Sequence, residues 1–240
     1  MDVIESKAGE DWVAAMRRVY TEDAATAEHL SGPDQNYALL RDCCVPIFAL
    51  RILGKGRLRN VLDVGCGTGS LARVLAALAE RVSGIDAVHE AIEIARQRAV
   101  GTGNIDFAVA DIFSTPLAAE TYDLIHVREF HPLTRDLYAD DGEKRTAHRQ
   151  IIAKLAATLA PGGHIYIAHM TAKRQCVTSA DLAGVGGLEM ICRGIDGRVL
   201  FLVAPVLGYR RLALTAARLL SLPLRLRRQS FFEIMVFRKP

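Results

Sequence analysis

Three glycines at alternating positions, Gly65, Gly67 and Gly69, follow a short β-rich apolar run and carry the clearest chemical implication in the chain. Glycine has no Cβ, so such a turn bends sharply and lets a ligand approach the backbone. The residues from Ser70 to Leu78 have helical character. The N-terminus of a helix offers unpaired N–H groups and a positive dipole end to an anionic group. The segment predicts a strand, a ligand-binding turn and a helix, the alternative being a tight turn that binds nothing.

An acidic residue, Asp63, stands two positions before the first glycine and helps to decide between two classes of nucleotide ligand. Dinucleotide-binding loops usually have the spacing G-x-G-x-x-G and hold a pyrophosphate at the helix N-terminus. Here the spacing is G-x-G-x-G, and a carboxylate beside the turn repels a diphosphate but attracts an ammonium group. S-adenosylmethionine carries an ammonium, a sulfonium and one carboxylate, and it has no phosphate. The electrostatics therefore favour S-adenosylmethionine.

The glycine segment resembles motif I of the class I S-adenosylmethionine-dependent methyltransferases, and later segments follow in register over about residues 58–170. The resemblance implies that Asp86 binds the ribose hydroxyls and that Asp111 and Ile112 contact the adenine. Arg128 either fixes its loop or lies near the methionine end of the cofactor. The cofactor-binding residues implied in this way are Asp63, Gly65, Cys66, Gly67, Gly69, Asp86, Ala87, Asp111, Ile112 and Arg128.

The fold expected for this chain is α/β, with a doubly wound, mostly parallel, seven-stranded Rossmann-like sheet. Strands and helices alternate from Asn60 to His169, which is typical of parallel strands joined by crossover helices. Ligands of such sheets bind at the carboxyl ends of the strands. We expect residues 58–240 to form the catalytic part and residues 1–57 a helical cap, together one structural domain.

Two residues after the fourth expected strand are candidates for catalysis, His131 first and Glu129 second. Methyl transfer depends chiefly on alignment of the reactants, and a general base is needed only when the acceptor is protonated at the working pH. Histidine titrates near neutrality and suits that role. The alternative for His131 is a loop histidine that bonds only to backbone.

Candidates for the acceptor pocket come from the expected cap and from the fifth expected strand. Tyr20, His29 and Tyr37 precede the sheet, and cap helices of this kind help to define the acceptor pocket in the family that the chain resembles. His169, at the end of the fifth strand, faces the same rim. The alternative, given equal weight, is that the cap residues only pack against the edge of the sheet and do not line a pocket.

The last 48 residues are strongly basic, with ten Lys and Arg against two acids. Asp196-Gly197 predicts a hairpin turn inside a variable basic lid or insertion over 188–230. Tyr209 to Leu222 predicts a helix that Pro223 ends, with an apolar side and basic residues recurring at Arg211, Arg218 and Arg225. Such a helix can lie on a membrane surface, bind an anionic nucleic acid, or cover the sheet as an ordinary solvent-exposed helix. We expect a lid or docking face for an apolar or anionic acceptor.

Composition narrows the classes of function. The first residues are polar and acidic, which is not the pattern of a secretory signal, and the longest apolar run, Val199–Leu207, is far shorter than the ~20 residues of a membrane span. We expect a cytoplasmic protein. The five cysteines have neither disulfide nor zinc spacing, so no metal site is predicted. No nucleic-acid partner is expected, because aromatic residues are few and do not alternate with basic ones.

The function that these features favour is methyl transfer from S-adenosylmethionine to a small molecule, such as a specialised metabolite or a quinone-like or lipid-like compound. A second hypothesis is a cofactor-binding protein that catalyses a cyclisation or rearrangement. A third is a non-catalytic cofactor-binding subunit. The fold alone does not separate the three, because function depends on the acceptor site.

Overall fold

The computed structural model describes residues 58–134, 140–170, 184–226 and 232–240, together with Arg51, Gly54, Tyr138 and Leu182. The expected cap lies outside these residues apart from Arg51 and Gly54. Tyr20, His29 and Tyr37 are therefore not among the residues described.

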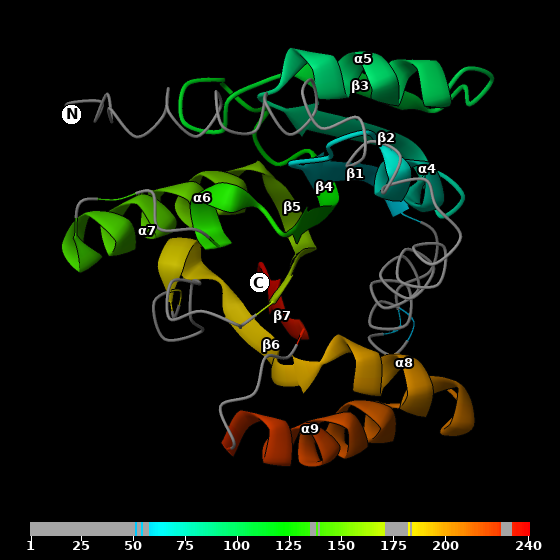
Figure 1. The fold of residues 1–240 in the computed structure, drawn as a ribbon, viewed down its shortest axis with the longest axis vertical. Coiled ribbons are helices and arrows are strands. Elements are labelled where there is room, and N and C mark those ends of the chain that lie inside the picture. Colours follow the sequence, from blue (N-terminus) through cyan, green and yellow to red (C-terminus); the bar gives the residue numbers. More distant parts are fainter. Residues whose placement is uncertain are drawn as a thin grey trace.

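Seven strands form a single sheet in the order β3-β2-β1-β4-β5-β7-β6 (Figure 1). Strands β1 to β5 pair in parallel, and β7 runs antiparallel to both of its neighbours. The doubly wound, mostly parallel sheet predicted from the sequence is confirmed. The strands are β1 Leu58–Val64, β2 Ala79–Asp86, β3 Ile105–Val109, β4 Tyr122–Arg128, β5 Leu159–Met170, β6 Glu189–Asp196 and β7 Phe232–Arg238.

Helices cover both faces of the sheet. Helices α4, α5, α8 and α9 contribute to one hydrophobic core, and α6, α7 and the short 3₁₀ helix η1 contribute to the other. None of the described helices is long and apolar enough to cross a membrane. The bounds are α4 Ser70–Leu75, α5 His89–Arg98, α6 His131–Thr134, α7 Asp141–Thr158, η1 Val185–Gly187, α8 Gly197–Val206 and α9 Arg211–Leu226.

The hairpin predicted at Asp196-Gly197 is wrong, because Asp196 instead begins a helix. Strand β6 ends at Asp196, and α8 starts at the next residue. The Asp196 carboxylate accepts a hydrogen bond from the backbone N–H of Arg198 at 2.8 Å, which is the role of a helix N-cap. Leu200 and Ala204, four residues apart, then turn into the core. The strand that pairs with β6 is β7.

Pro223 does not end the last helix, contrary to the prediction. Helix α9 runs through Pro223 to Leu226. Proline lacks only its own N–H donor, so near the end of a helix it leaves a single carbonyl without its usual partner. The side chain of Arg225 lies outside those described.

Candidate functional site

The glycine turn is held against the end of β2 by its own backbone. The N–H groups of Gly65 and Cys66 both donate to the carbonyl oxygen of Ile85, at 2.8 and 3.0 Å. The N–H of Gly67 donates to Oδ2 of Asp86 at 2.9 Å, and the N–H of Val88 donates to Oδ1 at 2.9 Å. Asp86 therefore fixes the turn and lies beside it at the carboxyl edge of the sheet.

Two glycines of the turn are required by both backbone angle and space. Gly65 has φ +69°, and a Cβ there would lie 2.7 Å from Cδ2 of Phe130. Gly69 has φ +75°, and a Cβ there would lie 2.7 Å from Cζ of Phe107. Both φ values belong to the left-handed region that favours glycine. Since Phe130 follows β4, the contact with Gly65 also brings the end of β4 against the turn.

Asp63 is buried at the end of β1 and makes a hydrogen bond that the sequence analysis did not predict. Its Oδ1 lies 2.8 Å from Nδ1 of His126, which stands opposite it in β4. The ring of His126 stacks on that of Tyr166 in β5, with the ring centroids 5.4 Å apart. Within the described part of the chain, Oδ2 of Asp63 is buried and has no hydrogen-bond partner. That oxygen can accept a hydrogen bond from a ligand.

The electrostatics of the turn are anionic. Neither Asp63 nor Asp86 forms an ion pair with a lysine or arginine among the described residues. Burial raises the pKa of Asp86, and the N–H donors of Val88 and Gly67 oppose that shift. Burial also raises the pKa of the Cys66 thiol, and the two carboxylates add to the rise. Cys66 therefore stays a protonated, buried side chain, and a cationic ligand suits the turn.

Asp111 and Ile112 follow β3, where the resemblance implies adenine contacts. Asp111 accepts hydrogen bonds from the Phe113 N–H at 3.0 Å and from the Ser114 hydroxyl at 3.3 Å. The Ile112 side chain is buried in the core, and its carbonyl accepts from Nζ of Lys154 at 2.6 Å. Burial lowers the pKa of Lys154, while Asp111 acts in the opposite direction. The adenine contacts stay predictions.

The end of β4 carries a strained residue between Arg128 and the catalytic candidate His131. Glu129 has φ +47°, and its N–H donates to the carbonyl of Ala168 at 2.9 Å. A side chain in this region costs about 1–2 kcal/mol, and such residues cluster at functional sites. His131 begins the short helix α6. Glu129 and His131 flank Phe130, the residue against Gly65, and their proposed roles in catalysis stay predictions.

Arg128 and His169 point to opposite faces of the sheet. The Arg128 guanidinium lies 5.8 Å from the centroid of the Phe232 ring, a cation–π geometry that anchors the end of β4 against β7. His169 follows Ala168 in β5 and so alternates to the other face. Its exposure is 1%, and burial lowers its pKa to about 4, with His148 adding to the shift. Its proposed contact with the acceptor stays a prediction.

Sequence reasoning missed His126, Tyr166 and Lys154. His126 and Tyr166 lie within apolar strand sequences, and only the strand register reveals that they form a row with Asp63. Lys154 is 42 residues away in sequence from Ile112, whose carbonyl it contacts. Among the described residues there is no group of three or more His, Cys, Asp or Glu that could hold a metal ion.

Known proteins are similar in sequence to the part of the chain that contains the glycine turn. Residues 61–163 match the family model described as a methyltransferase domain. The nodulation protein S of Sinorhizobium fredii is 35% identical over 115 residues, which are 47% of this chain and 48% of that protein. A ubiquinone biosynthesis O-methyltransferase from Thiobacillus denitrificans is 28% identical over 137 residues, 57% of this chain and 55% of that protein. The chain thus spans about half the length of these curated relatives.

The chain also shares its fold with a solved structure. The N-methyltransferase NodS from Bradyrhizobium japonicum WM9 superposes with a TM-score of 0.57 at 21% identity, covering 86% of this chain and 99% of that one. The match to the family model covers strands β1 to β4, the glycine turn and the start of β5, which are the elements that build the site. Residues 61–163 are therefore similar in sequence to the methyltransferase domain family, and the chain shares its fold with NodS.

Proposed function

We propose that this chain transfers a methyl group from S-adenosylmethionine to a small-molecule acceptor. The observation that carries the proposal is the buried Asp63 carboxylate, which has one oxygen held by His126 and the other without a protein partner among the described residues, beside the glycine turn. A ligand with an ammonium group satisfies that oxygen. A diphosphate would be repelled by it and by Asp86.

Gly65 and Gly69 of the turn, and Asp63 and Asp86 beside it, each have a proposed role in holding the cofactor. The missing Cβ atoms of Gly65 and Gly69 allow the left-handed backbone angles and let Phe130 and Phe107 pack against the turn, which would hold its backbone in place for an adenosine ligand. Asp86 already accepts two backbone N–H groups, but a carboxylate has about four lone-pair sites and can still accept from two ribose hydroxyls. Asp63 Oδ2 would accept from the ammonium. When bound, S-adenosylmethionine supplies a methyl group already activated on a sulfonium.

For the acceptor, we propose a small molecule with a protonated nucleophile such as a hydroxyl. His131 would hold the proton that the nucleophile loses, with Glu129 as the second candidate. Support comes from their position beside Phe130, which contacts the glycine turn. The names of the relatives fit a small-molecule acceptor as well. Residues 1–57 would cover this acceptor and place Tyr20 and Tyr37 against it.

The test is calorimetry followed by a product assay. The purified chain should bind S-adenosylmethionine and its demethylated product and should not bind nicotinamide or flavin dinucleotides. Release of S-adenosylhomocysteine with phenol or amine acceptors would then establish methyl transfer. Conversion of an acceptor without loss of the methyl group would support a cyclisation or rearrangement instead. Binding without any turnover would support a non-catalytic subunit, and absence of binding would refute all three hypotheses.

A further inference from the structure

The two C-terminal helices turn large apolar side chains to solvent. Six of the nine large hydrophobic residues that are exposed in the described part of the chain lie on α8 and α9. Their exposed fractions run from 43% to 82%. Monomeric proteins rarely gather such residues at one place without a partner. We call these six, with three exposed arginines, the leucine–arginine surface: Leu202, Val206, Leu212, Leu219, Leu220, Leu222, Arg210, Arg211 and Arg218.

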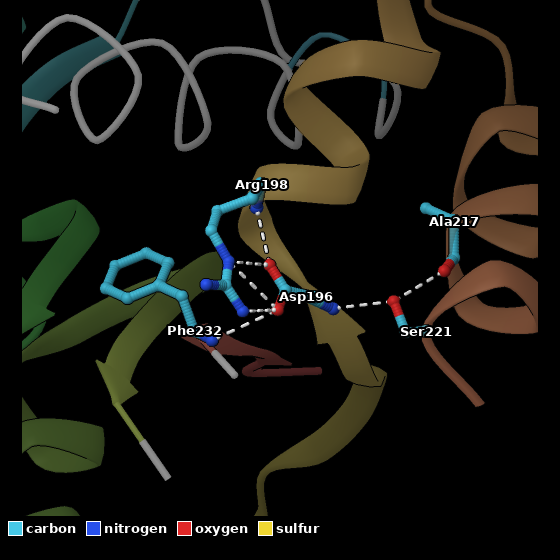
Figure 2. A network of polar contacts seen from close by, with 5 residues as sticks. All are labelled: Asp196, Arg198, Ala217, Ser221 and Phe232. Carbon is cyan, nitrogen blue, oxygen red and sulfur yellow. Dashed lines mark hydrogen bonds and ion pairs between the residues drawn. The ribbon is translucent and has the colours of Figure 1, made fainter. Parts of the chain in front are cut away.

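The orientation of α9 is fixed by its small residues, and this decides which side faces outward. Ala213, Ala217 and Ser221 recur every four residues and are fully buried. The Ser221 hydroxyl accepts from the Asp196 N–H at 2.9 Å and donates to the Ala217 carbonyl at 2.6 Å (Figure 2). With 3.6 residues per turn, Leu212 and Leu219 lie on the opposite side. The apolar side predicted from the sequence is therefore largely the exposed one.

The anchor of this arrangement is Asp196. It is fully buried, and its carboxylate binds the Arg198 side chain and also accepts from the backbone N–H of Phe232 in β7 at 3.3 Å (Figure 2). One residue thus joins β6, β7, α8 and α9. Because this network is buried and multiply bonded, rotating α9 to bury its leucines would break it. The outward leucines are a consequence of the packing.

Charge selects the partner for this surface. Helices α8 and α9 contain no acidic residue, and Arg211 and Arg218 flank the outward leucines of α9. Leucines on one side with arginines at the flank are typical of helices that lie in the plane of an anionic bilayer surface. Two copies of this chain meeting face to face would bring their arginines together, and like charges oppose that contact.

We propose that the leucine–arginine surface docks this protein on membranes that contain anionic lipid. The leucines would enter the boundary between headgroups and acyl chains, while the arginines contact lipid phosphates. This inference does not depend on the proposed methyl transfer, because the docking surface is separate from the glycine turn. Figure 1 shows α9 at one end of the molecule and α5 at the other.

Co-sedimentation with vesicles, without any cofactor, tests the proposal. The full chain should bind vesicles of phosphatidylcholine mixed with phosphatidylglycerol, should bind pure phosphatidylcholine weakly, and should lose affinity as salt is raised. The double variant Arg211→Glu/Arg218→Glu should bind at least about 25-fold more weakly, since each of the two lost basic residues near the surface is worth about fivefold. Its charge-matched control is Arg81→Glu/Arg145→Glu, on exposed residues of β2 and α7.

The apolar contribution is tested separately. Leu212→Gln/Leu219→Gln should lower the affinity about tenfold or more, while Val100→Gln, at an exposed residue after α5, should not. Far-UV circular dichroism checks that each variant is folded. Failure of the wild type to bind anionic vesicles, or equal losses in the controls, overturns the proposal. The proposal is also overturned if the wild type is a dimer, the leucine variant is a monomer, and neither of the two binds vesicles.

Discussion

Asp63 and His126 form a fully buried pair between neighbouring parallel strands, with Oδ1 of the aspartate 2.8 Å from Nδ1 of the histidine. A carboxylate only accepts hydrogen bonds, so the shared hydrogen belongs to Nδ1. The bond fixes the plane of the carboxylate, and the other oxygen is buried with no hydrogen-bond partner among the described residues. His126 is thus a positioning residue for the group that the proposed function assigns to the cofactor's ammonium.

Removal of the histidine should therefore weaken both folding and binding. His126→Leu leaves a buried carboxylate without its partner, and breaking such a pair costs about 3–5 kcal/mol of stability. His126→Asn keeps a donor near the position of Nδ1, so we expect it to recover part of the stability and most of the affinity. Chemical denaturation and calorimetry with S-adenosylmethionine measure the two quantities. Equal affinities for the Leu and Asn variants would show that the hydrogen bond positions nothing.

A second prediction concerns the contact between Gly65 and Phe130. Gly65→Ala should destabilise the fold for two reasons, a left-handed φ that costs about 1–2 kcal/mol and a clash with the ring that adds about 1–3 kcal/mol. Gly101→Ala is the matched control, because Gly101 has φ +87° and a Cβ there would meet no other atom within 4 Å. Thermal or urea unfolding compares the two. If both variants lose the same stability, the ring contact contributes nothing.

The strands were predictable because local sequence marks their ends. Apolar runs followed by an acid or a glycine, as at Asp63 and Asp86, recur where parallel strands meet their ligand edge. The partner of Asp63 was not predictable in the same way. His126 is 63 residues away, and the pairing depends on the register between β1 and β4. Sequence patterns carry no information on such non-local register.

The C-terminal part shows a different limit of local patterns. An Asp-Gly pair suits both a hairpin turn and a helix N-cap, and at Asp196 the pairing of β6 with β7 selects the cap. In α9 the sequence predicted an apolar side of leucines but not whether that side faces the sheet or the solvent. Ala213, Ala217 and Ser221 allow a closer approach to the sheet, and the hydrogen bond of Ser221 fixes that choice.

A third prediction tests the proposed general base. His131→Ala should lower turnover of a phenolic acceptor by about 10²–10⁴-fold near neutral pH, while the affinity for S-adenosylmethionine stays unchanged. Raising the pH should recover turnover as the acceptor ionises by itself. His89→Ala, at an exposed histidine of α5, serves as the control. Unchanged turnover in His131→Ala would show that His131 is not the general base and that the rate comes from alignment of the reactants.

A fourth prediction follows from the buried His169, whose pKa is lowered from 6.5 to about 4. Between these values the unfolded chain binds a proton that the folded chain does not, so the free energy of unfolding falls as the pH drops through this window. By pH 4 the loss should be about 3 kcal/mol. Well above pH 6.5 the histidine is neutral in both states and contributes no slope.

Two variants isolate this contribution from that of other acid-sensitive groups. His169→Gln cannot titrate, so its unfolding free energy should change less with pH than that of the wild type. His89→Gln removes a histidine whose side chain is 66% exposed and should keep the wild-type slope. Urea unfolding across the window gives all three slopes. If His169→Gln is as acid-sensitive as the wild type, the histidine is either protonated in the fold or open to solvent, and its burial against α7 does not govern its charge.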